Sequence, residues 1–558
     1  MIESVADKIW KGAWRGPLFA ALVALAAVLP GVLAMPVLDR DEARFAQASA
    51  QMLESRDPVS INFQTEPRAK KPVGIYWLQS ISVAAVSAVE RREIWAYRLP
   101  SLLAAMAAAA ACAWGAAAFM GSRGGAIAGA ILGASLILST EGFIAKTDAA
   151  LCAAVTLMMA ALARIYGSSR GEGEAYLGTR VLFWLGLALS MLLKGPIGPM
   201  VAALTMAALW ISDRRAPWLG SLGWSWGLGL VLLVVGPWAM AVTVATDGSF
   251  WTGAVMGDMV SKLGRGQESH GAPPGLHLLL TPLLIFPATA LLPAGLVHGW
   301  TARNATHVRF ALCWLLPSWI VFELAPTKLP HYTLPLYGAL AWLIAAALAE
   351  PIGRISRYIG AGLGLLAAGA LAAAGLVLAS SYGTAVSMGW AAAAAVLLTA
   401  GAICAVVLIL FKRQSVTALA ATVTLGVLAH DVLAAGLAPT LQPLWVSSRV
   451  AQAVRGANLD PRNGVIPGPI AVAGYAEPSL VFLLGTRTEL GDAASAAVAI
   501  ADGRPAIVEA REQSGFLNAL KDEDARAVPA GEIKGLNYSK GKPVDLILYR
   551  SLESGGAP

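Results

Sequence analysis

Long apolar runs separated by short polar segments extend along the chain up to about residue 438. Runs of about 17–25 residues are long enough to cross the hydrocarbon core of a bilayer as α-helices. We therefore expect a polytopic α-helical membrane protein. The pattern predicts about thirteen spans, at 17–35, 97–120, 124–142, 149–166, 179–193, 195–212, 218–245, 276–298, 309–324, 331–349, 356–380, 386–411 and 415–437.

From about Pro439 the pattern changes to that of a soluble domain. Short apolar runs at 469–474, 505–509 and 544–549 alternate with helix-like segments at 478–484, 493–501 and 513–521. Such alternation is typical of a small α/β domain. We expect a membrane domain over 1–438 and a soluble α/β domain over 439–558.

Composition supports a membrane protein. The chain has 558 residues, of which 57% are hydrophobic and only 13% are charged, whereas soluble domains carry about 25% charged residues. We attribute the net charge of +7 to basic loops that set topology, not to nucleic-acid binding. The four cysteines lie inside apolar runs and are expected to pack as small hydrophobic residues; they are Cys112, Cys152, Cys313 and Cys404.

The distribution of basic residues decides whether segment 72–90 crosses the bilayer. If it lies on the surface and the basic N-terminus is inside, most basic loops also fall inside, as the positive-inside rule requires. If it crosses, these loops move outside. We therefore predict an interfacial helix, for which Tyr76 and Trp77 are suitable anchors. The loops concerned contain Arg123, Arg164, Arg170, Arg214, Arg215, Arg303, Arg309, Arg354, Arg357, Lys412 and Arg413.

The loop after the first span contains a dense group of charges on the predicted outer side. Asp41 and Arg44 are three residues apart and would share one face of a helix. A carboxylate there is a candidate general base for an attacking hydroxyl, and Glu42 lies in the same cluster. The alternative interpretation is a solvated loop with local salt bridges.

Lys70 and Lys71 precede Pro72 at the start of the predicted interfacial helix. A lysine binds a ligand phosphate as a point charge, and Pro72 would hold Lys71 in place. Contact with anionic lipid head groups is the alternative.

Other polar clusters are expected on the same side. Asp148, in Lys-Thr-Asp, is either a second acid of the site or part of a helix N-cap. Lys194, before Gly195 and Pro196, either binds substrate or extends to the membrane interface. Arg265 and His270 lie in a Gly-containing loop that either closes over an anionic substrate or is a plain connection.

The last cluster, at 327–335, contains Lys328, His331 and Tyr332 between two prolines. The histidine is a possible metal ligand, but the chain shows no spacing for a closed zinc site. A divalent metal is possible but not expected, and no cofactor is predicted.

Six motifs occur together in one order: LDRDEARFAQASAQML, KKPVGIYWLQ, RLPS, KTDAAL, LLKGPIG and KLPHYTLP. Each alone is a weak signal, but the ordered set is specific. With these motifs the chain resembles the GT-C glycosyltransferases that use polyprenyl-phosphate sugars. It is most similar to the bacterial lipid A aminoarabinose transferases and to the family related to protein O-mannosyltransferases. The resemblance covers roughly residues 20–350 and the outer soluble domain.

The resemblance implies a location and an activity. The enzyme would lie in the bacterial inner membrane with a cytoplasmic N-terminus. Its first loop, with interfacial helices over 37–96, its active site and its C-terminal domain would be periplasmic. It would move a sugar from a polyprenyl-phosphate donor such as undecaprenyl phosphate to an envelope acceptor, lipid A, lipopolysaccharide or a similar glycan, with inversion.

The resemblance also implies roles for individual residues. Asp41 would be the base, with Asp148 as the second acid. The donor phosphate would be bound by Lys71, Arg44, Arg265 and Lys70. Further substrate contacts are expected from Glu42, Tyr76, Lys194, His270, Lys328, His331 and Tyr332.

One position departs from the pattern. Some aminoarabinose transferases have a glutamate where this chain has Lys70. If that glutamate helps to hold a metal in those relatives, this chain lacks the site. The lysine also makes the donor pocket more cationic, which disfavours aminoarabinose as the sugar.

Three other functions are compatible with a chain of this class. A protein O-glycosyltransferase would have the same fold. A transporter or flippase for lipid-linked sugars would need polar groups near the midplane and inverted repeats, whereas the clusters here are predicted at one surface. A non-catalytic envelope scaffold is the third, and the joint presence of Asp41, Lys71 and Asp148 argues against it.

Overall fold

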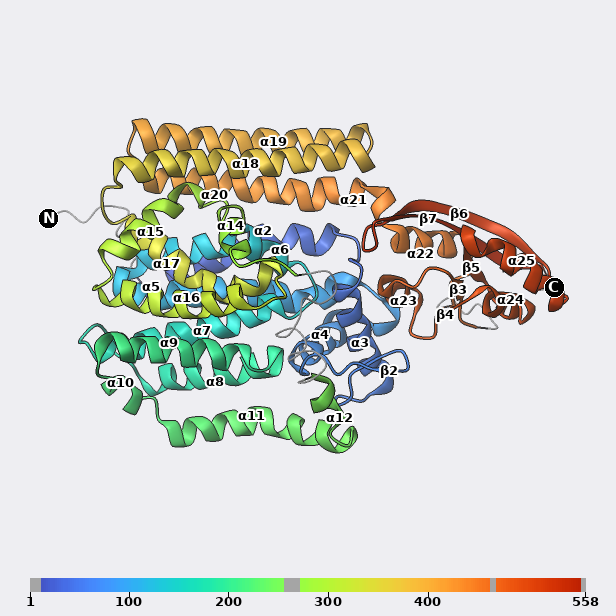
Figure 1. Ribbon diagram of the computed structural model, residues 1–558, viewed down its shortest axis with the longest axis horizontal. Helices are drawn as coiled ribbons and strands as arrows, with labels where there is room; N and C mark the ends of the chain where they lie inside the picture. Colours follow the sequence, from blue (N-terminus) through green and yellow to red (C-terminus); the bar gives the residue numbers. More distant parts are fainter. Residues whose placement is uncertain (1–11, 255–270, 462–467, 553–558) are drawn as a thin grey trace.

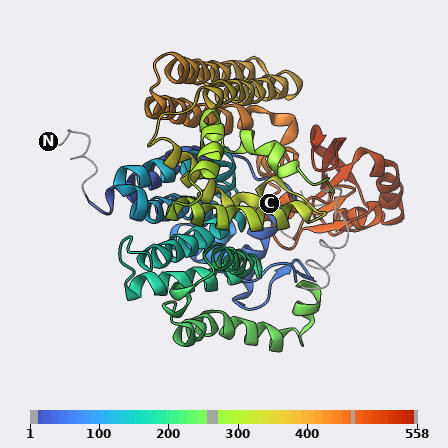
Figure 2. The same ribbon diagram turned by 60° about the vertical axis from the view of Figure 1, so that its left-hand side comes forward.

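The computed structural model describes residues 12–254, 271–461 and 468–552. Most of the helices lie side by side in a bundle, and a small domain containing a sheet projects from one end of it (Figures 1 and 2). Among the described residues, nine helices are long and apolar enough to cross a membrane, or up to ten if one bent pair is a single span. They are α2 (Arg15–Ala34), α5 (Ile94–Ala134), α7 (Asp148–Ser168), α8 (Leu177–Lys194), α11 (Trp224–Ala245), α16 (Thr306–Leu324), α18 (Arg354–Tyr382), α19 with η5 (Ala385–Phe411) and α20 to α21 (Ser415–Thr440).

The other predicted spans are short or divided. Two of them merge in α5, which is broken at Gly121 by a non-helical backbone with φ 68° and ψ 175°. The helix α6 (Leu136–Gly142) continues that segment, and α9 (Ile197–Asp213) is a shorter apolar helix. The bent pair of α14 (Leu276–Leu284) and η3–α15 (Thr289–Thr301) turns through 117°. A last segment combines η4 (Pro330–Leu336) with α17 (Tyr337–Ala347). The polytopic helical architecture predicted from the apolar runs is confirmed.

The first loop folds at the end of the bundle that faces the small domain (Figure 1). It contains α3 (Asp41–Ser55), the short strands β1 (Asn62–Phe63) and β2 (Glu66–Pro67), α4 (Gly74–Val86) and η1 (Val89–Arg91). With 13 residues, α4 is about 20 Å long, too short to cross the hydrocarbon core. Its Gly74 packs so closely on α8 that a Cβ would lie 2.7 Å from the Leu192 carbonyl oxygen.

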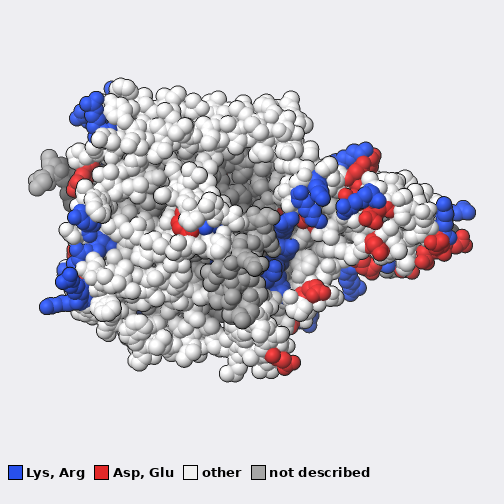
Figure 3. All heavy atoms as spheres, in the orientation of Figure 1, with Lys and Arg blue, Asp and Glu red and all other residues white. Residues whose placement is uncertain are grey.

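Basic residues gather at the opposite end of the bundle. Figure 3 shows Lys and Arg side chains along the edge farthest from the small domain. The helix ends that carry many of the arginines predicted to be inside lie there: the end of α7, the end of α9 and the start of α18 (Figure 1). Many of the basic residues that we expected on one side of the membrane therefore lie at one end of the bundle.

The small C-terminal domain is an α/β unit, as the alternating runs predicted. Within residues 468–552 its sheet has the strand order β4-β3-β5-β7-β6. β3 lies between β4 and β5 and pairs in parallel with both, and β7 is antiparallel to β5 and β6. The elements are α22 (Val446–Gly456), β3 (Ala471–Ala473), α23 (Pro478–Leu484), β4 (Glu489–Gly491), α24 (Ala493–Ala501), β5 (Ala506–Glu509), α25 (Gln513–Asp522), β6 (Ala527–Asn537) and β7 (Lys542–Ser551).

A buried ion pair joins the first loop to the bundle. The Arg98 guanidinium on α5 donates to both carboxylate oxygens of Glu42, at 2.8 and 2.7 Å. It also donates to the backbone carbonyls of Val32, Met35 and Pro36 at the end of α2, at 3.3, 2.6 and 2.8 Å. Both side chains are fully buried. All five N–H donors of the guanidinium are thus used to hold α2, α3 and α5 together.

The first loop also contacts the C-terminal domain. The Tyr538 hydroxyl accepts a hydrogen bond of 2.7 Å from the Asp39 amide, and the Ser479 hydroxyl donates to the Asp39 carboxylate. Arg40 donates to the Ser539 carbonyl at 2.8 Å. Arg40 has φ 62°, a conformation that a non-glycine residue adopts only when its surroundings impose it. The domain therefore contributes to the shape of the chain just before α3.

We predict that breaking the Arg98–Glu42 pair strongly destabilises the protein. In Arg98→Met the Glu42 carboxylate stays buried without its main partner, which should cost about 3–5 kcal/mol. Thermal unfolding in detergent checks this. Arg511→Met is the control, because its pair with Glu509 involves a side chain that is 60% exposed, and such pairs contribute little. An unfolding midpoint of Arg98→Met equal to that of the control would contradict the assignment.

We also predict a pH-dependent contribution from Asp39. Burial raises the pKa of Asp39 to about 6, although the hydrogen bond from Ser479 acts in the opposite direction. The folded protein therefore holds this proton more tightly than the unfolded chain does. Its contribution to stability is lost as the pH rises from about 4 to about 6. Asp39→Asn should remove this part of the pH dependence, measured as unfolding midpoints between about pH 2 and pH 8.

Asp57 supplies a control of opposite sign. Burial acts to raise its pKa, but hydrogen bonds from Ser60 and Val59 lower it overall. The stability that Asp57 contributes is therefore present at neutral pH and lost in acid. An unchanged pH profile in Asp39→Asn, beside an altered one in Asp57→Asn, would refute the prediction for Asp39.

Candidate active site

A cavity of about 550 Å³ lies between the first loop and the ends of several helices. One wall is the start of α3, and a second is the β1–β2 hairpin with the residues that follow it. We call these two the outer walls. The third, which we call the inner wall, consists of the start of α7, the end of α8 and η4. The lining residues include Asp41, Arg44, Phe45, Phe63, Glu66, Pro67, Arg68, Ala69, Lys70, Lys71, Lys146, Thr147, Asp148, Lys194, Gly253, Thr327, Leu329, His331 and Tyr332.

The cavity brings together most of the residues that the sequence motifs singled out. These residues come from five separate regions of the chain, and each region ends or begins a helix on the side of the small domain. The predicted residues that line the cavity are Asp41, Arg44, Lys70, Lys71, Asp148, Lys194, His331 and Tyr332.

Asp41 is an exposed acid at a helix N-terminus. It is the first residue of α3, and its side chain is 62% exposed. The nearest Arg44 nitrogen lies 3.9 Å from its carboxylate, so the two residues share one helix face as their spacing predicted. A carboxylate at this position is stabilised by the helix dipole and is accessible to a ligand in the cavity.

Asp148 is an acid already surrounded by cations. Its carboxylate lies 2.5 Å from the Lys194 ammonium and 3.7 Å from that of Lys146. The nearest nitrogen of His331 is 3.8 Å away. Its side chain is only 6% exposed. Both oxygens of Asp148 lie near protein cations, so its carboxylate is less accessible to a ligand than that of Asp41.

Lys146 connects this cluster to Glu141, which lies on α6. Its ammonium is 2.8 Å from the Glu141 carboxylate, and both side chains are nearly buried. Burial alone would lower the pKa of Lys146, but the carboxylates of Glu141 and Asp148 raise it, and the net shift is upward. Lys146 therefore stays charged and helps to neutralise two acids at the inner wall of the cavity.

Aromatic and imidazole rings complete the inner wall. The Lys194 ammonium lies 5.3 Å from the centre of the Tyr332 ring, a cation–π contact. The rings of His331 and Tyr332 meet edge to face at 5.3 Å. His331 is also 3.5 Å from the Glu141 carboxylate. Lys194 thus has an acid on one side and a ring on the other, which holds its ammonium in a defined position.

Three predicted site residues lie outside the cavity lining. Glu42 is buried against Arg98. Tyr76 is buried, and its hydroxyl accepts a hydrogen bond of 3.2 Å from Arg68. Lys328 is 3% exposed and donates to the carbonyls of Ala272 and Ala325. Their burial and internal partners favour supporting roles over the substrate contacts that we expected. The two remaining predicted residues, Arg265 and His270, fall outside the described residues.

Four polar residues at or behind the wall were missing from the predicted site. Glu66 and Arg68 belong to the hairpin, and the Arg68 guanidinium lies 5.0 Å from the Phe45 ring. Lys146 belongs to the Lys-Thr-Asp motif, of which only Asp148 was predicted as a site residue. The sequence does contain a signal for Glu141, because an acid inside an apolar run usually has a specific partner or a functional role.

Positive charge dominates the cavity. Among its described lining residues, the acids are Asp41, Glu66 and Asp148, whereas the bases are Arg44, Arg68, Lys70, Lys71, Lys146 and Lys194. A concave surface with an excess of one sign concentrates ligands of the opposite sign. The cavity is therefore suited to an anion such as a phosphate. In the described ranges, no group of three or more His, Cys, Asp and Glu side chains is placed to hold a metal ion.

Comparisons with known proteins agree with this architecture. Residues 70–240 match the family of dolichyl-phosphate-mannose-protein mannosyltransferases. The crystal structure of ArnT from Cupriavidus metallidurans bound to undecaprenyl phosphate is similar with a TM-score of 0.74, over 97% of this chain and 99% of that one, at 18% identity. This chain has the GT-C fold. It is a multi-pass membrane protein.

Sequence relatives support the same resemblance. The undecaprenyl phosphate-alpha-4-amino-4-deoxy-L-arabinose arabinosyl transferase of Yersinia enterocolitica is 28% identical over 332 residues, 59% of this chain and 58% of the relative. That of Pseudomonas paraeruginosa is 31% identical over 346 residues, 60% of each chain. The predicted similarity to aminoarabinose transferases is confirmed. The match spans about three fifths of the length of these curated relatives.

Proposed function

We propose that this protein is a glycosyltransferase that moves a sugar from a polyprenyl-phosphate donor to an acceptor of the bacterial cell envelope. The observation that carries the proposal is the cavity itself, where the accessible acid Asp41 is joined by an excess of lysines and arginines. A sugar phosphate needs both, a base for the attacking group and cations for the leaving phosphate. The names of the relatives and the structural likeness to ArnT support this choice.

The proposed reaction is a single displacement at the anomeric carbon. An acceptor oxygen forms a bond to this carbon while the bond to the phosphate oxygen breaks, so the configuration inverts. Asp41 takes the proton of an acceptor hydroxyl, and polyprenyl phosphate leaves with the bonding electron pair. If the acceptor is itself a phosphate, no proton needs to be removed and Asp41 orients it instead.

The cations of the outer walls would bind the donor phosphate. Lys71, Lys70 and Arg44 keep their proposed roles, and Arg68 joins them because it lines the same cavity. Such preorganised charges stabilise the negative charge that grows on the leaving group. Asp148 and Lys194 would shape the sugar-binding wall, since each is already paired with the other.

We further propose that the reaction takes place on the periplasmic face of the inner membrane. The cavity lies at the end of the bundle that carries the C-terminal domain, and the basic helix ends lie at the other. The positive-inside rule then makes the domain end periplasmic. The charged cluster at one end of the bundle favours transfer at a surface over carriage of a lipid-linked sugar across the membrane.

A protein acceptor is the second candidate within the same chemistry. The match of residues 70–240 to protein mannosyltransferases favours it, whereas the resemblance to lipid A aminoarabinose transferases favours a lipid acceptor. Mass spectrometry of lipid A, core polysaccharide and envelope proteins from a deletion strain distinguishes them. The fraction that loses a sugar contains the acceptor.

We predict that Asp41→Asn lowers transfer about 10²- to 10⁴-fold, because the base is lost while the shape is kept. Lys71→Ala should abolish measurable transfer through loss of phosphate binding. The assay follows release of polyprenyl phosphate from a labelled polyprenyl-phosphate sugar together with labelling of an envelope extract. Lys412→Ala is the control, an exposed lysine at the opposite end of the bundle.

The same assay discriminates the alternatives. Release in step with acceptor labelling identifies a transferase, whereas movement of intact donor across a vesicle membrane identifies a transporter. Near-normal transfer by either Asp41→Asn or Lys71→Ala would disprove the site assignment.

A further inference from the structure

The two outer walls of the cavity are not transmembrane helices. One is the first turn of α3, which carries Asp41 and Arg44, and the other is the β1–β2 hairpin, which carries Glu66 and Arg68. The strands of the hairpin have only two residues each, and an isolated hairpin is marginally stable at best. Something beyond the first loop must therefore hold these walls in place.

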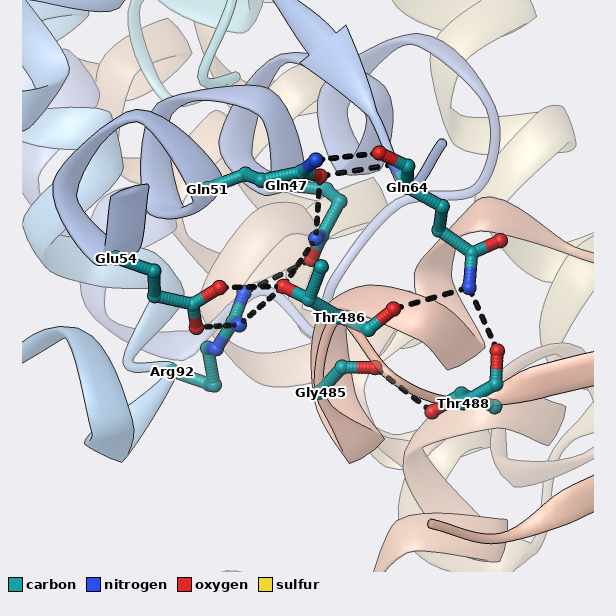
Figure 4. A network of polar contacts seen from close by, with 8 residues as sticks. All are labelled: Gln47, Gln51, Glu54, Gln64, Arg92, Gly485, Thr486 and Thr488. Carbon is teal, nitrogen blue, oxygen red and sulfur yellow. Dashed lines mark hydrogen bonds and ion pairs between the residues drawn. The ribbon is translucent and has the colours of Figure 1, made fainter. Parts of the chain in front are cut away.

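A turn of the C-terminal domain, residues 485–488, contacts both walls (Figure 4). The Gln47 amide on α3 donates to the Thr486 hydroxyl at 2.8 Å. The Gln64 side-chain amide of the hairpin donates to the backbone carbonyls of Thr486 and Thr488, at 3.1 and 2.6 Å. The same short turn thus binds the helix and the hairpin at once.

The two walls are also bonded to each other beside this turn. The Gln51 side-chain amide on α3 donates to the Gln64 backbone carbonyl at 2.5 Å and accepts from the Gln64 backbone N–H at 2.9 Å (Figure 4). Gln64 has φ 54°, a left-handed conformation that its surroundings must maintain. Because the side chain and the backbone of Gln64 are both engaged, its position follows that of the turn and of α3.

Arg92 adds a nearly buried cation to the partly buried Thr486 contact. Its guanidinium, with 2% of the side chain exposed, donates to Gln47 at 2.8 Å and to the Thr486 hydroxyl at 3.0 Å, and it pairs with Glu54. The Thr486 hydroxyl in turn donates to Glu54 at 2.6 Å. The hydroxyl therefore uses its one donor and both acceptor positions. A desolvated guanidinium that loses such a partner pays a large penalty.

We propose that turn 485–488 positions the two outer walls of the cavity, and that Thr486 is the positioning residue of the proposed transfer reaction. Its consequence for catalysis rests on the proposed function. Arg44 and Arg68 lie on different walls, so a donor phosphate held between them requires a defined separation. Thr486 sets this separation through α3 and the hairpin and does not line the cavity itself.

The test compares three variants at the turn. Thr486→Val keeps the shape and removes the hydroxyl, whereas Thr486→Ser keeps the hydroxyl. Thr488→Val is the matched control, because the Thr488 hydroxyl donates to the Gly485 carbonyl within the domain, at 2.8 Å, and among the described residues makes no hydrogen bond to α3 or to the hairpin. Gln64→Leu is a second variant that releases the hairpin alone, should Thr486→Val fail to fold.

The first measurement is steady-state transfer with a polyprenyl-phosphate sugar. In Thr486→Val, kcat/KM for the donor should fall about tenfold, mainly through a higher KM, because separated cations bind the phosphate less well. Thr486→Ser should restore the wild-type value, and Thr488→Val should keep it. Equal donor KM in Thr486→Val and wild type would overturn the proposal, as would a matching loss in Thr488→Val.

The second measurement does not depend on the reaction. Amide hydrogen exchange should accelerate over residues 41–55 in Thr486→Val, which loses the bond to Gln47, and over residues 60–68 in Gln64→Leu, which loses the bonds of the hairpin to the turn. It should remain unchanged over both ranges in Thr488→Val. If wild-type protein transfers no sugar, the proposed function fails, but faster exchange still supports the positioning of the walls. Unchanged exchange in both Thr486→Val and Gln64→Leu would refute it whether or not the protein is active.

Discussion

The geometry of the cavity depends on the buried guanidinium of Arg98. This side chain binds Glu42 at the start of α3 and three carbonyls at the end of α2. Glu42 also accepts a hydrogen bond of 2.8 Å from the Ala145 amide, next to Lys146. The helix that carries Asp41 and the segment that carries Lys146 are therefore fixed to one group. Because desolvating two charges offsets much of their attraction, the pair is better regarded as a determinant of arrangement than as a source of net stability.

Charges in the site divide into a buried set and an accessible set. Glu141 and Asp148 are neutralised by Lys146 and Lys194 within hydrogen-bonding or ion-pairing distance. Asp41 remains largely exposed in the cavity. A buried, paired carboxylate keeps its position but is poorly suited to accept a proton, whereas an accessible one can exchange protons with a substrate. This division is the physical reason why we propose Asp41 for the chemistry and Asp148 for the shaping of the wall.

The walls of the site obey different structural constraints. Within the hydrocarbon core every backbone polar group must be satisfied inside its own segment, so spans become helices with little freedom. The first loop lies beyond that constraint and needs partners of its own. Arg98 supplies them where the loop leaves the bundle, and the C-terminal domain supplies them farther out, through Asp39 and through Thr486. The soluble domain is thus part of the structure that surrounds the cavity.

The sequence by itself determined the helical spans, the common end of the bundle at which the polar clusters gather, the α/β character of the C-terminal domain and most of the charged residues of the cavity wall. Hydrocarbon thickness sets span length and charge asymmetry sets orientation, and both can be read locally. Only the tertiary structure decided which of two neighbouring charges faces the cavity. Successive residues of a helix point about 100° apart, so Asp41 lines the cavity while Glu42 turns to Arg98. The sequence could not predict the role of Thr486, because its partners are hundreds of residues away and meet it only when the domain packs on the first loop.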